Sequence, residues 1–419
     1  MERSSSRPRI HPSIPDWRQM ATLKAPAGIP TREEFLDRAR ALVPALRARA
    51  AACDSARMVP AETIADYRAA GLIRMSMPRR YSGYEMGWDI LCEVSQILAA
   101  ACGSQAWIQR ICADHAQMVS TFPAQAQDDV WGDDHDVLVS AAFDPTGRAR
   151  AVEGGWIFSG RHGFSSGIDH CDWHICGGFI ADGDDLDGPH FFLVPKADIT
   201  VIDDWFVMGL AGTGSKSFEV KDAFVPSHRF LDGPKARRGE NPGSRVNKAA
   251  VYRTPRGGIT SNGFAALAVG MAKGVVEDWI AYTRPRKSRG IPIADKQSTQ
   301  IIAARSAAEV DAAEALYMST LRDAQKILEA GGKLTAMQVA TARRNSAFAC
   351  KLSLKAGTRV FNAAGGRALF SGNSLERQYR NLLGAVAHHG MVWDVAATTW
   401  GQMVMEGDGA APAPGDPTP

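Results

Sequence analysis

The chain has 419 residues, of which 45% are hydrophobic and 22% are charged, a composition typical of a globular protein with a sizeable core. Its 48 basic and 45 acidic side chains leave a formal net charge of +3, which is too balanced to indicate binding to nucleic acid or to a membrane surface. We therefore expect a small-molecule ligand. The seven cysteines show no CxxC pair, so we expect a cytoplasmic protein with no disulfide framework and no metal site.

Helical patterns dominate the first third of the chain. Residues 1–28 are rich in Pro, Arg and Ser and are expected to be disordered. Residues Thr31 to Glu34 (TREE) match a capping box, and apolar side chains then recur at helical spacing. Further helices are predicted from Pro60 to Gly71, from Trp88 to Ala101 and from Ser104 to Met118. These patterns predict a helical N-terminal domain over residues 29–135.

The pattern changes at Val137 to short runs rich in β-branched and aromatic residues, separated by Gly, Asp and Pro. Such runs predict strands of a barrel or sandwich. They cover residues 137–143, 154–160, 174–180, 190–195, 199–202 and 217–225. We expect a central β domain over residues 136–233, followed by a polar linker over residues 234–248.

The last part of the chain again has helical periodicity. Four helical segments are predicted, over residues 259–283, 295–331, 334–363 and 374–404. Their lengths favour an antiparallel four-helix bundle over residues 249–407, with a disordered tail over residues 408–419. The expected fold is therefore α+β, with a helical domain, a β domain and a helical bundle in that order.

The sequence contains neither a well-formed phosphate-binding loop nor a dinucleotide-binding motif. Residues Gly209 to Lys216 (GLAGTGSK) loosely resemble a phosphate-binding loop, but the spacing is wrong and a strand is predicted to follow them. No GxGxxG follows a strand and opens a helix, so we expect no nicotinamide site within this chain.

The loop that contains Ser165, Ser166 and Gly167 lies between two predicted strands, with Trp173 shortly after it. It is either an ordinary hydroxyl-rich turn or a site that brings a hydroxyl close to a planar heterocycle. In the second interpretation, Trp173 covers one face of that ring.

Three ordered stretches carry a resemblance to a known family: GRHGFSSGIDHCDW, DWFVMGLAGTGSKSFEVKDAFVPSHR and NAAGGRALFSGNSLERQYRNL. Together they resemble the acyl-CoA dehydrogenase superfamily. More closely, they resemble the group D flavin monooxygenases, the oxygenase components of two-component phenol hydroxylases, including those acting on 4-hydroxyphenylacetate and on phenolic seco-steroids. The resemblance spans about residues 30 to 405 and implies an acyl-CoA dehydrogenase-like fold.

The resemblance gives the triplet His388-His389-Gly390 a meaning. A dehydrogenase of this superfamily typically carries a catalytic glutamate here as a general base. The stretch from Gly257 to Ala266 supplies no replacement carboxylate. The resembling oxygenases place a histidine at the position of His388, near the flavin edge where oxygen reacts. His389 receives no role, and the alternative is that both are ordinary surface histidines.

The resemblance also implies a substrate site. His115 lies in an otherwise apolar predicted helix and is either a satisfied core residue or the base that contacts a phenol oxygen. Ser140, on the first predicted strand, is the hydroxyl expected to accompany it, although a register shift of one or two residues is open at Val139-Ser140-Ala141-Ala142. Imidazole, with an ordinary pKa of about 6.5, can accept a phenol proton.

The remaining expected site residues bind the cofactor. Ser166 is expected to bond flavin N5, next to Ser165, Thr213 and Ser215. Arg286 and Gln300 match a segment that reaches the flavin phosphates of a neighbouring subunit, where a guanidinium suits bidentate contact; the alternative for this segment is a solvated basic turn. Gly365 and Gly366 allow close approach of the backbone to the cofactor, although helix packing alone could explain them.

The resemblance implies an oxygenase that uses reduced FMN or FAD and O2 to hydroxylate an aromatic substrate at the ortho position through a 4a-hydroperoxyflavin. Reduced flavin would come from a separate NAD(P)H-dependent flavin reductase, which accounts for the missing nicotinamide motif, and a homotetramer is expected. The alternatives are a related flavin N- or S-oxygenase and an acyl-CoA dehydrogenase-like flavoenzyme.

Overall fold

The computed structural model describes residues 28–181, 189–237 and 240–406. The segments predicted to be disordered, 1–28 and 408–419, lie outside these residues except for Gly28. Within the described ranges, no helix is both long and apolar enough to cross a membrane.

Five helices precede the sheet: α1 (Arg32–Ala56), α2 (Ala61–Ala69), α3 (Trp88–Ala101), α4 (Gly103–Val119) and α5 (Ala124–Trp131). The predicted capping box forms at the start of α1, where the Thr31 side chain accepts from the Glu34 N–H and the Glu34 side chain accepts from the Thr31 N–H. Pro60 is the N-cap of α2, one position earlier than the sequence suggested. The predicted helices of this region are therefore confirmed.

A seven-stranded sheet follows, with the order β5-β6-β2-β1-β3-β4-β7. Its strands are β1 (Val139–Val152), β2 (Gly155–Ser165), β3 (Trp173–Ile180), β4 (His190–Pro195), β5 (Ile199–Ile202), β6 (Lys216–Pro226) and β7 (Phe230–Leu231). Only β1 and β3 pair in parallel; the other neighbours are antiparallel. All six predicted strands are present, and β7 is the one that the sequence pattern missed.

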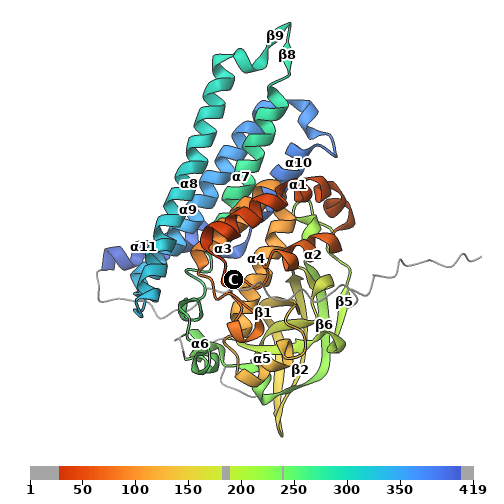
Figure 1. Cartoon of the computed structure of the whole chain (residues 1–419), viewed down its shortest axis with the longest axis vertical. Helices are drawn as coiled ribbons and strands as arrows, with labels where there is room; N and C mark the ends of the chain where they lie inside the picture. Colours follow the sequence, from red (N-terminus) through yellow and green to blue (C-terminus); the bar gives the residue numbers. More distant parts are fainter. Residues whose placement is uncertain (1–27, 182–188, 238–239, 407–419) are drawn as a thin grey trace, which may run out of the picture.

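The C-terminal helices are α7 (Asn262–Thr283), α8 (Gln297–Glu329), α9 (Ala336–Ala364), α10 (Ser374–Val386) and α11 (Trp393–Glu406). A small hairpin, β8 (Lys287–Ser288) and β9 (Ile291–Pro292), joins α7 to α8 at the tip of the bundle (Figure 1). The fourth predicted segment is not one helix. It breaks after α10, and a short 3-10 turn from His389 to Met391 precedes α11.

The predicted linker is more ordered than its polar composition suggested. It carries the short helix α6 (Gly233–Arg237) and a 3-10 turn from Pro242 to Arg245. The Asn247 amide donates to Ser120 O at 2.7 Å, and the Gly243 N–H donates to Thr121 O at 2.9 Å. These bonds hold the segment against the end of α4, because buried polar groups need partners.

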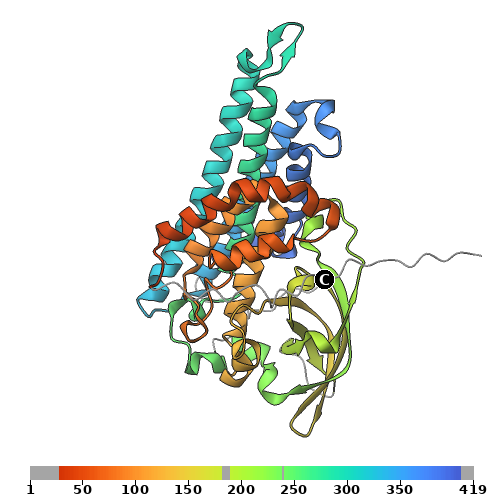
Figure 2. The same cartoon turned by 45° about the vertical axis from the view of Figure 1, so that its right-hand side comes forward.

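Helix α4 lies at the centre of the molecule, between the sheet on one side and the bundle on the other (Figures 1 and 2). Every one of its 17 residues is buried. It packs against β1, α3 and α7. Polar side chains on this helix therefore lie in the interior, where the sheet and the bundle meet.

Candidate active site

One side of α4 carries four polar or amphipathic side chains: Trp107, Arg110, Asp114 and His115. They stand at positions i, i+3, i+7 and i+8, which share one face of a helix. Because α4 is buried along its whole length, each of these side chains must find partners from the sheet or the bundle. The contacts of this face define the candidate site.

The Ser166 hydroxyl is the centre of a hydroxyl cluster. It accepts from Trp107 Nε1 at 3.2 Å and lies 2.6 Å from Ser215 Oγ. Thr213 Oγ1 lies 2.7 Å from Ser215 Oγ, and the Gly167 N–H donates to Thr213 O at 2.9 Å. The two loops that the sequence singled out, around Ser166 and from Gly209 to Lys216, thus meet. Because β6 begins at Lys216, the glycine-rich loop does not open a helix and is not a phosphate-binding loop.

The backbone around Ser166 is bent twice into the left-handed region. Phe164 has a φ of 56° and Gly167 a φ of 72°. A left-handed conformation at a residue other than glycine costs about 1–2 kcal/mol, and the Phe164 side chain is 78% exposed. That side chain packs edge-on against the Trp205 ring at 5.8 Å, and the hydrogen bonds of Ser165, Ser166 and Gly167 hold the buried side of the turn.

His388 reaches the same cluster from the break between α10 and α11. Its ring stacks on Phe264 at a centroid distance of 3.9 Å and lies 5.8 Å from the Trp107 ring. The Gly390 N–H donates to His388 Nδ1 at 3.1 Å. Burial lowers the pKa of His388 to about 3, so the ring is neutral at neutral pH. Because Nδ1 accepts a bond, the proton must sit on Nε2, which makes Nε2–H a donor.

Arg110 links this cluster to the rest of the α4 face. Its guanidinium lies 4.7 Å from the Phe264 ring and donates to Asp114 at 2.8 Å and to Thr260 O at 2.7 Å. Arg256 donates to the other oxygen of Asp114 at 3.1 Å. Burial alone would raise the pKa of Asp114, but the guanidinium groups of Arg256 and Arg110 hold it well below its usual range. Asp114 is thus a buried carboxylate shared by two cations.

His115 lies beside this charged group. Its Nδ1 is 2.7 Å from Val139 O, and because a carbonyl oxygen can only accept, Nδ1 carries the proton. Burial lowers the pKa of His115 to about 4, so the ring is neutral and Nε2 is an acceptor. Phe143 packs edge-on against the ring at 5.8 Å, and the Arg256 guanidinium lies 5.5 Å from Phe143. His115 and His388 therefore hold opposite tautomers at the two ends of one chain of contacts.

The structure does not bring two of the predicted site residues to the partners expected for them. The Ser140 hydroxyl makes no hydrogen bond to His115 among the described residues; it lies 2.6 Å from His174 Nδ1 and 2.8 Å from Ser165 Oγ. Trp173 also turns away from the Ser166 loop. Its ring packs into a cluster of the sheet and the N-terminal helices, under the Arg229 guanidinium at 4.8 Å.

Arg286 lies between α7 and the hairpin at the tip of the bundle, Gln300 lies in the first turn of α8, and Gly365 and Gly366 directly follow α9. There Arg286 donates to Ala364 O at 2.7 Å, directly before Gly365, and stands 4.4 Å from the Tyr282 ring. Gln300 donates to Ala294 O at 3.2 Å. Within one chain, Arg286 thus lies beside the start of the Gly365-Gly366 segment.

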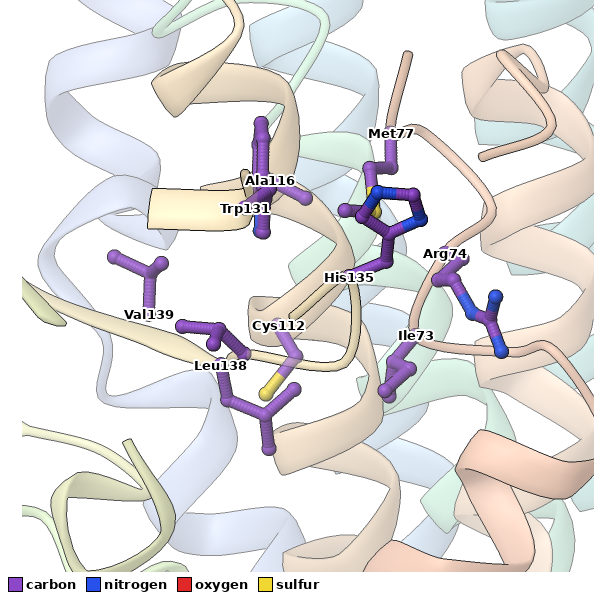
Figure 3. A pocket seen from close by; sticks show the side chains of 10 residues that line it. Ile73, Arg74, Met77, Cys112, Ala116, Trp131, His135, Leu138 and Val139 are labelled. Carbon is purple, nitrogen blue, oxygen red and sulfur yellow. The ribbon is translucent and has the colours of Figure 1, made fainter. Parts of the chain in front are cut away.

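A small cavity of about 10 Å³, room for about one water molecule, lies on the other side of α4 (Figure 3). Its lining includes Cys112, Ala116, Trp131, His135 and Val139. Neither Ser166 nor His388 lines it. We therefore place the candidate site at the contact chain from Ser166 to His115 and not in this cavity.

Trp107, Phe264 and Arg110 were not among the site residues predicted from the sequence. Trp107 contacts Ser166 and Phe264 contacts His388, whereas Arg110 bonds Asp114, the neighbour of His115 in the chain. A signal for Trp107 and Arg110 was available, because both share a helical face with His115. Phe264 had no comparable signal, since its partner His388 lies more than a hundred residues away in the chain.

Comparisons with known proteins give the family. Residues 262–393 match the family model for the acyl-CoA dehydrogenase C-terminal domain. The chain is 32% identical to the oxygenase subunit HsaA of a flavin-dependent monooxygenase from Rhodococcus jostii, over 85% of this chain and 93% of that protein. It is 30% identical to the oxygenase component of an FADH2-dependent resorcinol hydroxylase from a Rhizobium species, over 92% and 97%. The crystal structure of HsaA from M. tuberculosis superposes with a TM-score of 0.86 at 30% identity, over 90% and 98%. The resemblance noted in the sequence is confirmed: the chain belongs to the family of flavin-dependent monooxygenase oxygenase components, which are built on the acyl-CoA dehydrogenase fold.

Proposed function

We propose that this chain hydroxylates a phenolic substrate at the ortho position, with O2 and with reduced FMN or FAD that a separate NAD(P)H-dependent flavin reductase supplies. The balanced reaction converts phenol, O2 and reduced flavin to catechol, water and oxidised flavin. The observation that carries the proposal is the pair of neutral histidines with opposite tautomers, an acceptor at His115 and a donor at His388.

The residues around Ser166 suit a flavin. An isoalloxazine ring is planar and apolar on its faces and has nitrogen and oxygen atoms along its edge. The Ser166, Ser215 and Thr213 hydroxyls offer polar partners, while Trp107 and Phe264 offer apolar surface. When bound, reduced flavin supplies the electrons that activate dioxygen. The residues Ser165, Ser166, Thr213 and Ser215 would form this part of its site.

His115 would receive the phenol. Its free Nε2 is an acceptor for the substrate O–H, and the bond from Nδ1 to Val139 O fixes the ring. With a pKa of about 4, it is a weak base in the free enzyme. It would therefore hold the phenol proton in a hydrogen bond and take it over as the ring carbon is oxidised, a step worth roughly 10²- to 10⁴-fold in rate.

His388 would supply the complementary proton. Its Nε2–H is a donor, and its ring lies against Trp107, whose indole N–H bonds the Ser166 hydroxyl. A donor in this place can hydrogen-bond the oxygen that develops negative charge at the flavin edge. Burial of Trp107 and Ser166 supports exclusion of water there.

A homotetramer would complete the cofactor site. The Arg286 and Gln300 side chains, with Gly365 and Gly366, would hold the phosphate part of a flavin bound mainly to a neighbouring subunit. Directly beside them, Leu369 and Phe370 are 67% and 72% exposed, and exposed apolar side chains of this size favour burial in a subunit contact. A cytoplasmic location is part of the proposal and is consistent with seven free cysteines, all of them buried.

The test is a His115→Asn variant. Asparagine can keep the donor to Val139 O but has no counterpart of Nε2. We expect hydroxylation of phenols to fall by roughly 10²- to 10⁴-fold, while the variant still binds reduced flavin and turns O2 into hydrogen peroxide. His135→Asn, in the cavity of Figure 3, is the matched control and should leave turnover unchanged. Unaltered hydroxylation in His115→Asn would contradict the assigned role and would favour oxygenation at nitrogen or sulfur.

A further inference from the structure

An ion pair joins the two loops that carry the hydroxyls of the proposed flavin site, at a place outside the hydroxyl cluster. Asp169 lies in a short 3-10 turn from Ile168 to His170, directly after the Ser166 loop, and Lys216 is the first residue of β6. Lys216 Nζ donates to Asp169 Oδ1 at 2.8 Å. The two side chains are largely buried, with 15% and 16% of their areas exposed. This contact, the loop ion pair, therefore connects the segment after Ser166 to the segment after Ser215.

Lys216 has a second carboxylate nearby, but that contact is the weaker one. Asp203 lies 3.8 Å from Lys216 Nζ, and its side chain is 55% exposed. Its two oxygens accept from Arg57, each at 2.8 Å. Ionic contacts of exposed groups contribute little, because water screens them. Breaking the contact with Asp169 costs more, because it leaves an unpaired charge in a largely buried place. The loop ion pair is therefore the contact of Lys216 that can fix the position of the loops.

The glycine-rich loop packs tightly against this pair. Gly214 has a φ of 53°, and a Cβ atom there would lie 2.9 Å from Asp169 Oδ2 and 3.0 Å from the Arg57 carbonyl oxygen. Asp169 Oδ2 is buried and has no hydrogen-bond partner among the described residues, so the carboxylate is anchored through Oδ1 and Lys216. Lys216 thus sets the position of the carboxylate that borders Gly214.

The other contacts between the two loops include hydrogen bonds that a ligand would change. The Ser166 and Ser215 hydroxyls lie 2.6 Å apart, and Thr213 Oγ1 lies 2.7 Å from Ser215 Oγ. A hydroxyl has a single proton to donate, so a hydroxyl that donates to the flavin edge no longer donates to its neighbour. The bond from the Gly167 N–H to Thr213 O and the loop ion pair take no part in this exchange. They are the contacts that can hold the loops together once a flavin is bound.

We propose that Lys216 and Asp169 are positioning residues, whose ion pair keeps the two loops at a fixed spacing when the Ser166 and Ser215 hydroxyls bind the flavin ring. The inference rests on the proposed function in taking these hydroxyls as flavin contacts. It predicts that the pair contributes more to flavin affinity than to the stability of the flavin-free protein, because without flavin the hydroxyl bonds also hold the loops.

The experiment measures two quantities: the Kd of reduced FMN and reduced FAD by anaerobic titration, and the denaturant midpoint of the flavin-free protein. Lys216→Met combined with Asp169→Leu removes the pair without leaving an unpaired charge. We expect this double variant to keep the wild-type midpoint and to raise the Kd about tenfold, the effect of one lost charge-assisted hydrogen bond. Lys216→Arg can still pair with the carboxylate and should keep the Kd within about threefold.

Asp203→Asn is the matched control. It removes the more distant and exposed carboxylate near the same lysine, so the Kd and the midpoint should stay close to their wild-type values. If the double variant does not fold, Lys216→Gln carries the same test, since it removes the charge of the lysine and leaves the Asp169 carboxylate in place. Its Kd should also rise about tenfold.

Two results would overturn the inference. One is an unchanged Kd in the double variant. The other is a midpoint that falls together with the rise in Kd, which would show that the pair only stabilises the fold. Failure of the proposed function is a separate outcome: a wild-type protein that binds reduced flavin but hydroxylates no phenol contradicts the proposed function alone.

Discussion

A single backbone group sets the proton position of each site histidine. Val139 O accepts from His115 Nδ1, and the Gly390 N–H donates to His388 Nδ1. Since each ring is neutral, the distal nitrogen of His115 can only accept and that of His388 can only donate. The two side chains therefore differ in chemistry although their residue type and their low pKa values are alike.

The donor role of His388 can be tested with two variants of equal size. Asparagine and aspartate can both accept from the Gly390 N–H, as N-cap residues commonly do, but only asparagine keeps a donor. We expect His388→Asn to retain hydroxylation within about tenfold and His388→Asp to lose about 10²-fold or more. Product formation per reduced flavin measures the difference. Equal activity of the two variants would show that a donor at this position is not needed.

At the scale of secondary-structure elements, the loop that carries Thr213 and Ser215 is anchored on α10. The Asn381 side chain accepts from the Leu210 N–H at 2.8 Å, and Arg380 donates to Met208 O at 2.5 Å. Gly209 sits so close to α10 that a Cβ atom there would overlap the Arg380 carbonyl oxygen. The bundle thus sets the position of a loop that belongs to the sheet.

A Gly209→Ala substitution should therefore move this loop. Because the overlap is with backbone, the loop must shift away from α10, and we expect the Kd of reduced flavin to rise at least about tenfold. Gly401→Ala on α11, where a Cβ would meet nothing within 4 Å, is the control and should bind flavin normally. Unchanged flavin affinity in Gly209→Ala would show that this loop does not take part in binding the cofactor.

The helices of this fold can be predicted from local sequence more closely than the contacts of the candidate site can. The capping box at Thr31 and the apolar face of residues 88–101 are local signals, and α1 and α3 begin where these signals place them. The break after α10 was missed because helical periodicity shows neither the bond from the Gly390 N–H to His388 Nδ1 nor the stacking of His388 on Phe264. The contacts of Ser140 with His174 and Ser165 could not be predicted from the sequence, because a slip of one residue along a strand reverses the face of its side chain.

At the scale of the whole molecule, two buried histidines of the β domain make the stability of the fold depend on pH. His162 and His174 are fully buried and flank Phe218, at ring distances of 5.1 Å and 5.6 Å. Burial lowers the pKa of His162 to about 4 and that of His174 to about 3. The nearby charges are Asp144, which raises the pKa of His162, and Lys196, which lowers that of His174.

Stability should therefore fall on acidification. In the unfolded chain both rings bind protons below about pH 6.5, while in the folded chain they stay neutral until the lower pKa values are reached. The free energy of unfolding therefore carries no penalty from either ring above about pH 6.5. Below that pH it falls by at most about 1.4 kcal/mol per pH unit for each ring. Denaturant unfolding between neutral pH and pH 5 measures the slope. His162→Phe, which keeps the aromatic stack, should reduce that slope; an unaltered slope would contradict the assignment.

Stopped-flow absorbance distinguishes an oxygenase from a dehydrogenase. The protein with bound reduced flavin is mixed with oxygenated buffer, and the return to the oxidised flavin spectrum is followed. We predict a distinct transient absorbance that outlasts the oxygen-dependent phase and decays faster when a phenol that the enzyme accepts is present. Immediate oxidation without a transient, together with bleaching of the oxidised flavin by an acyl-CoA thioester, would show that the protein is a dehydrogenase.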